Sequence, residues 1–170
     1  MVNLSTKKIA RAGVIAGLYV VLSLITLPVA SGAIQFRISE GLTLLALIFP
    51  ESCVALFVGC ALSNLISGCA ILDVVFGSLV TLASAVLTFA TGKIIKSVPL
   101  KIAVGGIFPV ILNALFLPLI WLWCYGVIEY VYYLQALFLF VSQALSVYAV
   151  GTPMFLMADK LHRNGTKFFE

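Results

Sequence analysis

Long apolar stretches alternate with short polar or Gly/Pro breaks along the whole chain. Apolar runs of this kind are typical of helices in a lipid bilayer, where a crossing needs ~20 residues. The pattern predicts six helical segments, over residues 8–27, 40–49, 51–66, 72–95, 101–124 and 133–161. The second segment is too short for a simple crossing. We therefore expect a short or tilted helix whose ends are shielded by neighbouring helices.

The breaks contain residues that end or bend helices. We expect the first helix to stop before Pro28, the second to begin near Ser39 as its N-cap, and a turn at residues 67–69. Three prolines lie inside predicted helices and should bend them: Pro109, Pro118 and Pro153.

Composition supports a lipid-embedded protein. Hydrophobic residues make up 63% of the 170 residues and charged residues only 9%, with a mean hydropathy of +1.21. A soluble domain needs far more polar surface, so we interpret residues 1–170 as a single all-α integral-membrane domain. The net charge of +4 does not indicate a nucleic-acid partner, because the basic residues flank the hydrophobic spans.

The few charges separate by side when the six segments are laid out as six crossings. One membrane face receives Lys7, Lys8, Arg11, Lys93, Lys96, Lys101, Lys160, Arg163 and Lys167, and the other receives Arg37, Glu40, Asp73 and Glu129. Basic loops stay cytoplasmic, so we expect both termini inside and a multi-pass protein of the cell membrane. The outer face then holds one cation, three carboxylates and nearby amides, which is the chemistry of a polar ligand pocket.

The strongest local signal is the segment QFRISE, which contains Gln35, Phe36, Arg37 and Glu40. An ion pair between Arg37 and Glu40 at a helix start would explain it simply, but such a pair contributes only about 0.2–0.5 kcal/mol. Arg37 is also the one basic residue on the predicted outer face, against the orientation bias. We favour a ligand loop at the mouth of a pocket.

Amides and a carboxylate extend this cluster onto other helices. Asp73 suits the first turn of a helix electrostatically, so capping alone could explain it. Asn64, Asn113 and Gln143 could simply join helices, at roughly 1 kcal/mol per bond, or could line a cavity. Paired donors and acceptors of this kind are what a planar heterocycle needs, and Trp121 and Tyr125 are candidate stacking partners, although an aromatic belt at the interface is an alternative.

The first helix carries a different signal, a double small-xxx-small spacing. Ala12 and Ala16 are four residues apart, as are Gly13 and Gly17. Such residues let another helix approach closely, either within the same bundle or from a partner protein.

Catalytic and metal-binding patterns are not visible in the sequence. His162 lies in the basic tail, far from the carboxylates in this topology, and the four cysteines form no C-x-x-C pair. Neither a metalloprotease motif nor a Gly-rich phosphate loop is present. We expect a binding protein rather than an enzyme, with no metal and no cofactor.

Several segments resemble the queuosine-precursor transporter family, QueT. They are AGVIAGLY at 12–19, IQFRISEGL at 34–42, GCALSNL at 59–65, DVVFGSLVTL at 73–82 and PVILNA at 109–114. Members of this family are substrate-binding S-components of energy-coupling factor (ECF) transporters. The resemblance covers most of the chain in order, and the second and fourth segments are the most specific.

The resemblance implies a six-helix S-component bundle with both termini inside, in a prokaryotic plasma membrane. It implies a 7-deazaguanine ligand such as queuine, captured from outside, and as partners a transmembrane T-component and two ATPase subunits that hydrolyse ATP. Ala12 and Ala16 match the family's small-residue motif, which docks on the T-component. A guanine-like edge could donate to Glu40 or Asp73, with Gln35, Asn64, Asn113 and Gln143 completing the hydrogen bonds, Arg37 at the carbonyl, and Phe36, Trp121 or Tyr125 stacking.

Three other functions stay open at this point. The chain could be an S-component for another heterocycle or vitamin. It could be a structural membrane subunit whose polar cluster only joins helices. It could also be an intramembrane enzyme using Glu40 and Asp73 as acid and base, although no nucleophile or metal set accompanies them.

Overall fold

The computed structural model describes residues 6–30, 36–126, 128 and 130–164, and this part of the chain is helical with no strand. The elements in order are α1 (Thr6–Ala30), the 3₁₀ helix η1 (Ile38–Leu47), α2 (Ser52–Ile66), α3 (Ile71–Ile94), α4 (Val98–Tyr125), α5 (Tyr132–Ala144), the π-helical η2 (Leu145–Gly151) and α6 (Thr152–Arg163). The last three follow one another without a break, so the described chain forms the six helical segments that the sequence predicts.

Four of these segments are long and apolar enough to cross a membrane. They are Thr6–Pro28, Ile71–Ile94, Val98–Tyr125 and the continuous stretch Tyr132–Arg163. The helices Ile38–Leu47 and Ser52–Ile66 are apolar but shorter. The protein is therefore a helical membrane protein.

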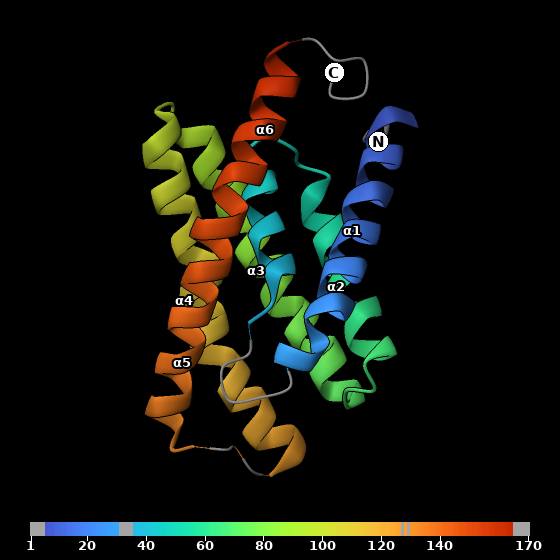
Figure 1. Cartoon of the computed structure of the whole chain (residues 1–170), viewed down its shortest axis with the longest axis vertical. Coiled ribbons are helices and arrows are strands. Elements are labelled where there is room, and N and C mark those ends of the chain that lie inside the picture. The colour runs from blue at the N-terminus through green and yellow to red at the C-terminus, as the bar shows by residue number, and fades with distance from the viewer. Residues whose placement is uncertain (1–5, 31–35, 127, 129, 165–170) are drawn as a thin grey trace.

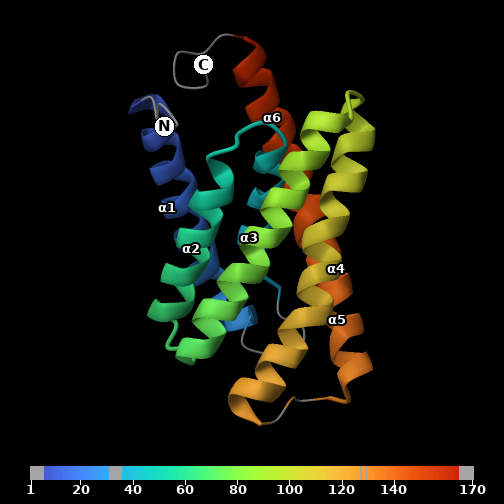
Figure 2. The ribbon, with the colours of Figure 1, turned by 180° about the vertical axis from the view of Figure 1, so that it is seen from behind.

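The helices run up and down a single bundle (Figures 1 and 2). The start of α1 and the end of α6 lie at the same end, together with the α3–α4 connection (Figure 1). The α2–α3 turn and the α4–α5 connection lie at the opposite end. In the α2–α3 turn, Gly68 adopts a φ of 75°, a left-handed conformation that glycine accepts at no steric cost. The turn predicted at residues 67–69 is confirmed.

Two of the predicted helix boundaries are wrong. Helix α1 continues through Pro28 to Ala30, because a proline in the last turn removes only one intrahelical hydrogen bond. Ser39 is not an N-cap, since η1 begins at Ile38 with Arg37 in the cap position and no side-chain cap bond. The hydroxyl of Ser23 in α1 instead donates to the Ser39 hydroxyl at 2.7 Å.

The expected disturbance at Pro153 takes the form of a π-helical turn. Segment η2 ends at Gly151, and Pro153 lies in the first turn of α6. A proline ring clashes with the carbonyl four residues earlier in a regular α-helix. The wider π turn relieves that clash without ending the helix.

The short helix η1 lies inside the bundle, where it packs against α1, α2, α3, α4, η2 and α6. Every residue from Ser39 to Leu47 is buried. A 3₁₀ helix rises about 2.0 Å per residue, against 1.5 Å in an α-helix, so its 10 residues extend roughly 20 Å. The neighbouring helices shield its ends, as expected.

Three residues per turn divide η1 into three strips, because residues i and i+3 eclipse. Glu40 and Thr43 lie on one strip. Leu42 and Leu45 lie on the second, in the apolar core that includes Tyr19 of α1. Leu44 and Leu47 lie on the third, in the separate core of α4, η2 and α6. The two leucine strips thus meet different parts of the bundle.

Glycines permit the closest approaches to η1. A Cβ on Gly41 would lie 2.8 Å from Ser146 O and 2.9 Å from Gly151 N, and a Cβ on Gly151 would lie 2.5 Å from Gly41 O. Only residues without side chains fit where these two backbones meet. In the same way, a Cβ on Gly105 of α4 would lie 2.8 Å from Leu47 Cδ2.

Candidate functional site

Polar side chains from η1, α2, α3 and α4 surround a narrow internal cavity with an open volume of about 10 Å³. Its lining residues are Arg37, Glu40, Cys60, Asn64, Asp73, Gly77, Thr81, Asn113, Leu117 and Trp121. That is room for about one water molecule, far less than the ~300–1,000 Å³ that ligand pockets usually enclose. A ligand can enter only when the side chains that line the cavity move apart.

Glu40 is at the centre of the polar network. Its Oε1 accepts a hydrogen bond from the Tyr19 hydroxyl at 2.5 Å, and its Oε2 accepts one from Asn113 Nδ2 at 3.2 Å. The residue is only 3% exposed. A carboxylate offers about four acceptor positions, so Glu40 keeps the capacity to accept from a further donor.

Asn113 joins Glu40 to the last helical segment. Its Nδ2 donates to Glu40 and also to Gln143 Oε1, at 3.3 Å. Both amide hydrogens are then used, and the Asn113 carbonyl oxygen remains an acceptor. Asn113 and Gln143 are each 1% exposed, so this amide pair is shielded from lipid and from water.

Arg37 pairs with an amide rather than with Glu40. Its guanidinium donates to Asn64 Oδ1 at 3.0 Å. The Asn64 Nδ2 in turn lies 3.7 Å from Cys60 Sγ, a weak acceptor. The amide hydrogens of Asn64 and the other guanidinium hydrogens of Arg37 are therefore the donors that this side of the cavity offers.

Asp73 lies at the start of α3, toward the end of the bundle that carries the α2–α3 turn (Figure 2). The Tyr125 hydroxyl donates to Asp73 Oδ2 at 3.2 Å and accepts from the backbone N–H of Ala70 at 3.0 Å. Asp73 is 5% exposed. Its carboxylate is thus held by an aromatic side chain from the end of α4.

The charge content of the cavity is unusual for a membrane interior. Two carboxylates and one guanidinium line it, and burying a charge is expensive unless it is paired or hydrogen-bonded. Hydrogen bonds satisfy each of these groups, but neither carboxylate forms an ion pair within the described residues. A cavity of this type can bind a polar molecule that presents both N–H groups and a carbonyl oxygen.

Most of the sequence-predicted site residues lie together. Six of them line the cavity: Arg37, Glu40, Asn64, Asp73, Asn113 and Trp121. Tyr125 and Gln143 reach it through their hydrogen bonds to Asp73 and Asn113. Phe36 is half-buried and does not line it, and Gln35 lies outside the described residues.

Sequence reasoning missed Tyr19, Cys60 and Thr81. Thr81 donates to Cys60 Sγ at 3.4 Å, and both line the cavity. Tyr19 is fully buried. A phenol in the middle of an apolar helix needs a hydrogen-bond partner, and that requirement was the available signal for Tyr19. A cysteine in an apolar run gives no comparable signal.

The small residues of α1 divide between two faces. Ala12 and Ala16 pack against the core, and a Cβ on Gly59 of α2 would lie 3.0 Å from Ala16 O. Gly13 and Gly17 lie about 100° around the helix from the alanines, with nothing within 4 Å of a Cβ placed on either. Packing inside the bundle thus uses the alanines, and the glycines remain on an open face.

A family model described as QueT transporter matches residues 9–160. No curated protein and no solved structure matches the chain. The matched region runs from the first turn of α1 to the last turns of α6 and includes every residue that lines the cavity. The chain belongs to the QueT transporter family, and its apolar helical bundle is that of a membrane transport protein which binds a small-molecule substrate.

Proposed function

We propose that this protein is the substrate-binding S-component of an ECF-type importer and captures a 7-deazaguanine, a queuosine precursor or salvage product such as queuine. The proposal rests on its membership of the QueT family and on one observation of the structure. That observation is the buried Glu40 carboxylate, which lies beside a guanidinium and several amides inside an apolar bundle.

The hydrogen-bonding groups of a 7-deazaguanine match this cavity. Its N1–H and exocyclic amine are adjacent donors, and its ring carbonyl is an acceptor. In our assignment the donor edge faces the free lone pairs of Glu40, while Arg37 or Asn64 donates to the carbonyl. Two hydrogen bonds to an ionised group that are made away from water are each worth about 1.5–3 kcal/mol.

Asp73 and Trp121 complete the proposed site. The indole of Trp121 lines the cavity and offers a flat surface on which a bicyclic base can stack. The Asp73 carboxylate, held by Tyr125, would accept from a polar or cationic substituent of the base. Phe36 and Gln35 precede η1 in the sequence, and we keep them in the proposal as a stacking group and a hydrogen-bonding group.

Energy for import would come from partner subunits. In this proposal a transmembrane T-component and two ATPase subunits join the chain in a prokaryotic plasma membrane. All six helical segments cross the bilayer, and both termini face the cytoplasm. The basic residues at the end that carries the start of α1 and the end of α6 support that orientation.

Equilibrium binding to the purified chain tests the function. Isothermal titration calorimetry with queuine, its biosynthetic precursor bases, guanine and riboflavin should show tight binding of a 7-deazaguanine and no binding of riboflavin, whose ring presents one N–H between two carbonyls instead of two adjacent donors. Tight binding of a different heterocycle would leave an S-component with another substrate. If none of these compounds bound, the chain would be a structural subunit and the proposed function would be wrong.

A further inference from the structure

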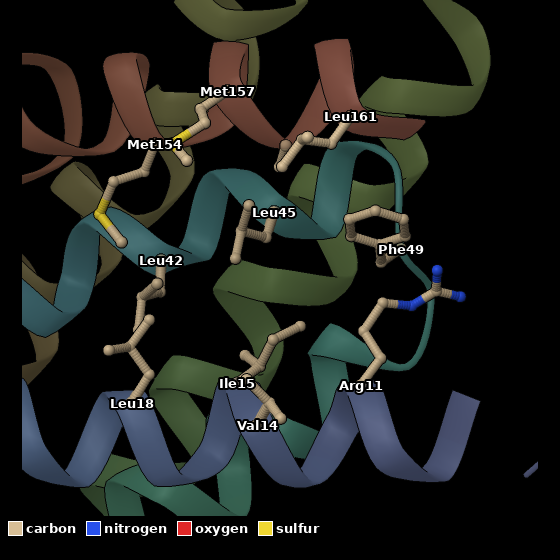
Figure 3. A pocket seen from close by; sticks show the side chains of 11 residues that line it. Arg11, Val14, Ile15, Leu18, Leu42, Leu45, Phe49, Met154, Met157 and Leu161 are labelled. Carbon is tan, nitrogen blue, oxygen red and sulfur yellow. The ribbon is translucent and has the colours of Figure 1, made fainter. Parts of the chain in front are cut away.

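A second concavity, distinct from the ligand cavity, opens between α1, η1 and α6 (Figure 3). It has an open volume of about 200 Å³, and the described residues that line it are Arg11, Val14, Ile15, Leu18, Leu42, Leu45, Phe49, Met154, Met157, Ala158 and Leu161. We call it the α1–α6 groove. Among the described residues that line it, Arg11 alone is charged, so this part of the groove is apolar with one polar end.

The groove runs along the bundle axis. Figure 3 shows Leu18 and Met154 at one end and Arg11, Phe49 and Leu161 at the other. From Leu18 to Arg11 it follows α1 for about two turns, or roughly 10 Å. Val14 is 56% exposed and Met157 is 67% exposed, so the two walls of the groove face outward from the bundle. Methionine side chains adapt to irregular apolar partners.

The charge of Arg11 is already paired at its end of the groove. Its guanidinium forms a buried ion pair with Glu51 and lies 4.2 Å from the centroid of the Phe49 ring. The His162 ring packs edge-on against the same phenyl ring, at 5.5 Å. In this cluster the Glu51 carboxylate balances the charge of Arg11.

Beyond that cluster the rim of the groove is cationic. Lys7 and Lys8 lie one turn before Arg11 on α1, and Lys160 lies in the last turn of α6. The nearby Asp159 is paired with Arg163 at 2.9 Å. Within the described residues none of the three lysines forms an ion pair. The rim therefore attracts an anion, and the groove below it attracts hydrocarbon.

We propose that the α1–α6 groove is a binding site for one anionic phospholipid. An acyl chain lies between Leu18 and Leu161, along the apolar walls, and the phosphate headgroup lies among Lys7, Lys8 and Lys160. The described surface is apolar along its length and basic at one end, and this charge pattern complements an amphiphile with an anionic head. A transmembrane helix of a protein partner has no such requirement for an anion at one end.

Native mass spectrometry of the purified full chain tests the site, with dioleoyl phosphatidylglycerol and dioleoyl phosphatidylcholine as probes. We expect one phosphatidylglycerol to be retained, with an affinity about tenfold or more above that of phosphatidylcholine, because each basic residue at a membrane surface adds to the attraction. The triple variant Lys7→Gln, Lys8→Gln, Lys160→Gln should lose this preference. The matched control Lys93→Gln, Lys96→Gln, Lys101→Gln removes three charges from the α3–α4 side of the same end and should keep it.

A second variant tests the groove itself. Val14→Trp places a large side chain on an exposed wall and should abolish retention of both lipids, while thermal unfolding in detergent stays close to wild type. Equal retention of the two lipids by the wild type would overturn the proposal. Phosphatidylglycerol binding that is unchanged in Val14→Trp would also overturn it, because the lipid would then lie elsewhere.

Discussion

The hydroxyl of Tyr19 in α1 donates a hydrogen bond of 2.5 Å to the Glu40 carboxylate in η1. Both residues are buried, and the bond joins the first membrane helix to the segment that carries the central acid of the cavity. A hydrogen bond to a charged group is worth about 1.5–3 kcal/mol. The orientation of Glu40 is therefore fixed by α1 as well as by its own helix.

Tyr19→Phe removes this bond and little else. We expect a loss of about 1.5–2 kcal/mol in the free energy of unfolding, because Glu40 keeps its buried charge with one partner fewer. Unfolding of the detergent-solubilised protein by sodium dodecyl sulfate measures it. Tyr148→Phe is the control, since the Tyr148 hydroxyl donates to the Ala103 carbonyl at 2.7 Å from an exposed position. Equal losses in the two variants would contradict the assigned role of Tyr19.

Glu40→Gln tests the proposed contact with the ligand. The amide keeps the size of the side chain but replaces one acceptor oxygen with a donor, which opposes an N–H edge. We expect 7-deazaguanine affinity to fall by about 2 kcal/mol, or roughly 30-fold. Calorimetry on the purified variant measures it, with Asp159→Asn as a charge-matched control at the other end of the bundle. Wild-type affinity in Glu40→Gln would exclude this carboxylate as a ligand contact.

The ion pair between Arg11 and Glu51 predicts strong coupling between two residues. Arg11→Met alone leaves a buried, uncompensated carboxylate and should destabilise the protein by about 3–5 kcal/mol. The double variant Arg11→Met, Glu51→Leu removes both charges and should be more stable than the single one. A double-mutant cycle of unfolding free energies measures the coupling. Arg163→Met breaks an exposed pair and should change stability by less than about 1 kcal/mol.

Glycine substitutions should differ sharply by position. Gly41→Ala and Gly151→Ala each place a methyl group against the other segment's backbone, and we expect losses of about 1–3 kcal/mol in unfolding free energy. Gly17→Ala meets open space and should be neutral or slightly stabilising, since alanine favours a helix. Thermal unfolding of the three variants checks this order. A destabilised Gly17→Ala would show that the outer face of α1 is not free.

The exposed glycines of α1 also test the proposed assembly. Gly13→Leu and Gly17→Leu add bulk to the face where a partner helix would approach, and neither residue lines the ligand cavity. If the chain is an S-component, uptake of radiolabelled ligand by cells should fall at least about tenfold while ligand affinity of the purified chain is unchanged. Uptake at the wild-type level in these variants would show that the two residues are not part of the docking surface.

The helical architecture could be predicted from the sequence because lipid imposes a strong pattern. A helix in a bilayer satisfies its backbone hydrogen bonds internally, so the break at residues 67–69 was visible as a short polar, glycine-containing interruption of an apolar run. The polar residues Arg37, Glu40 and Asn113 were identifiable for the same reason, since each is costly in lipid without a partner.

The pairing of those residues could not be predicted. Arg37 and Glu40 are three apart, which suggests an ion pair on a helix, yet Arg37 donates to Asn64 and Glu40 accepts from Tyr19 and Asn113. The 3₁₀ geometry of η1 also has no sequence signature, because its apolar residues fit an α-helix equally well. That geometry comes from contacts with the surrounding helices.

The threefold division of η1 sets a limit on how this region can vary. Adding or deleting one residue between positions 38 and 47 would rotate everything beyond it by roughly 120°, which is one full strip. A change before Glu40 would turn the acid onto one of the two leucine strips and bring Ser39 or Gly41 to its position, and a change after Glu40 would turn the leucines beyond it off their strips. Homologous chains can therefore change side chains in η1 far more easily than they can change its length.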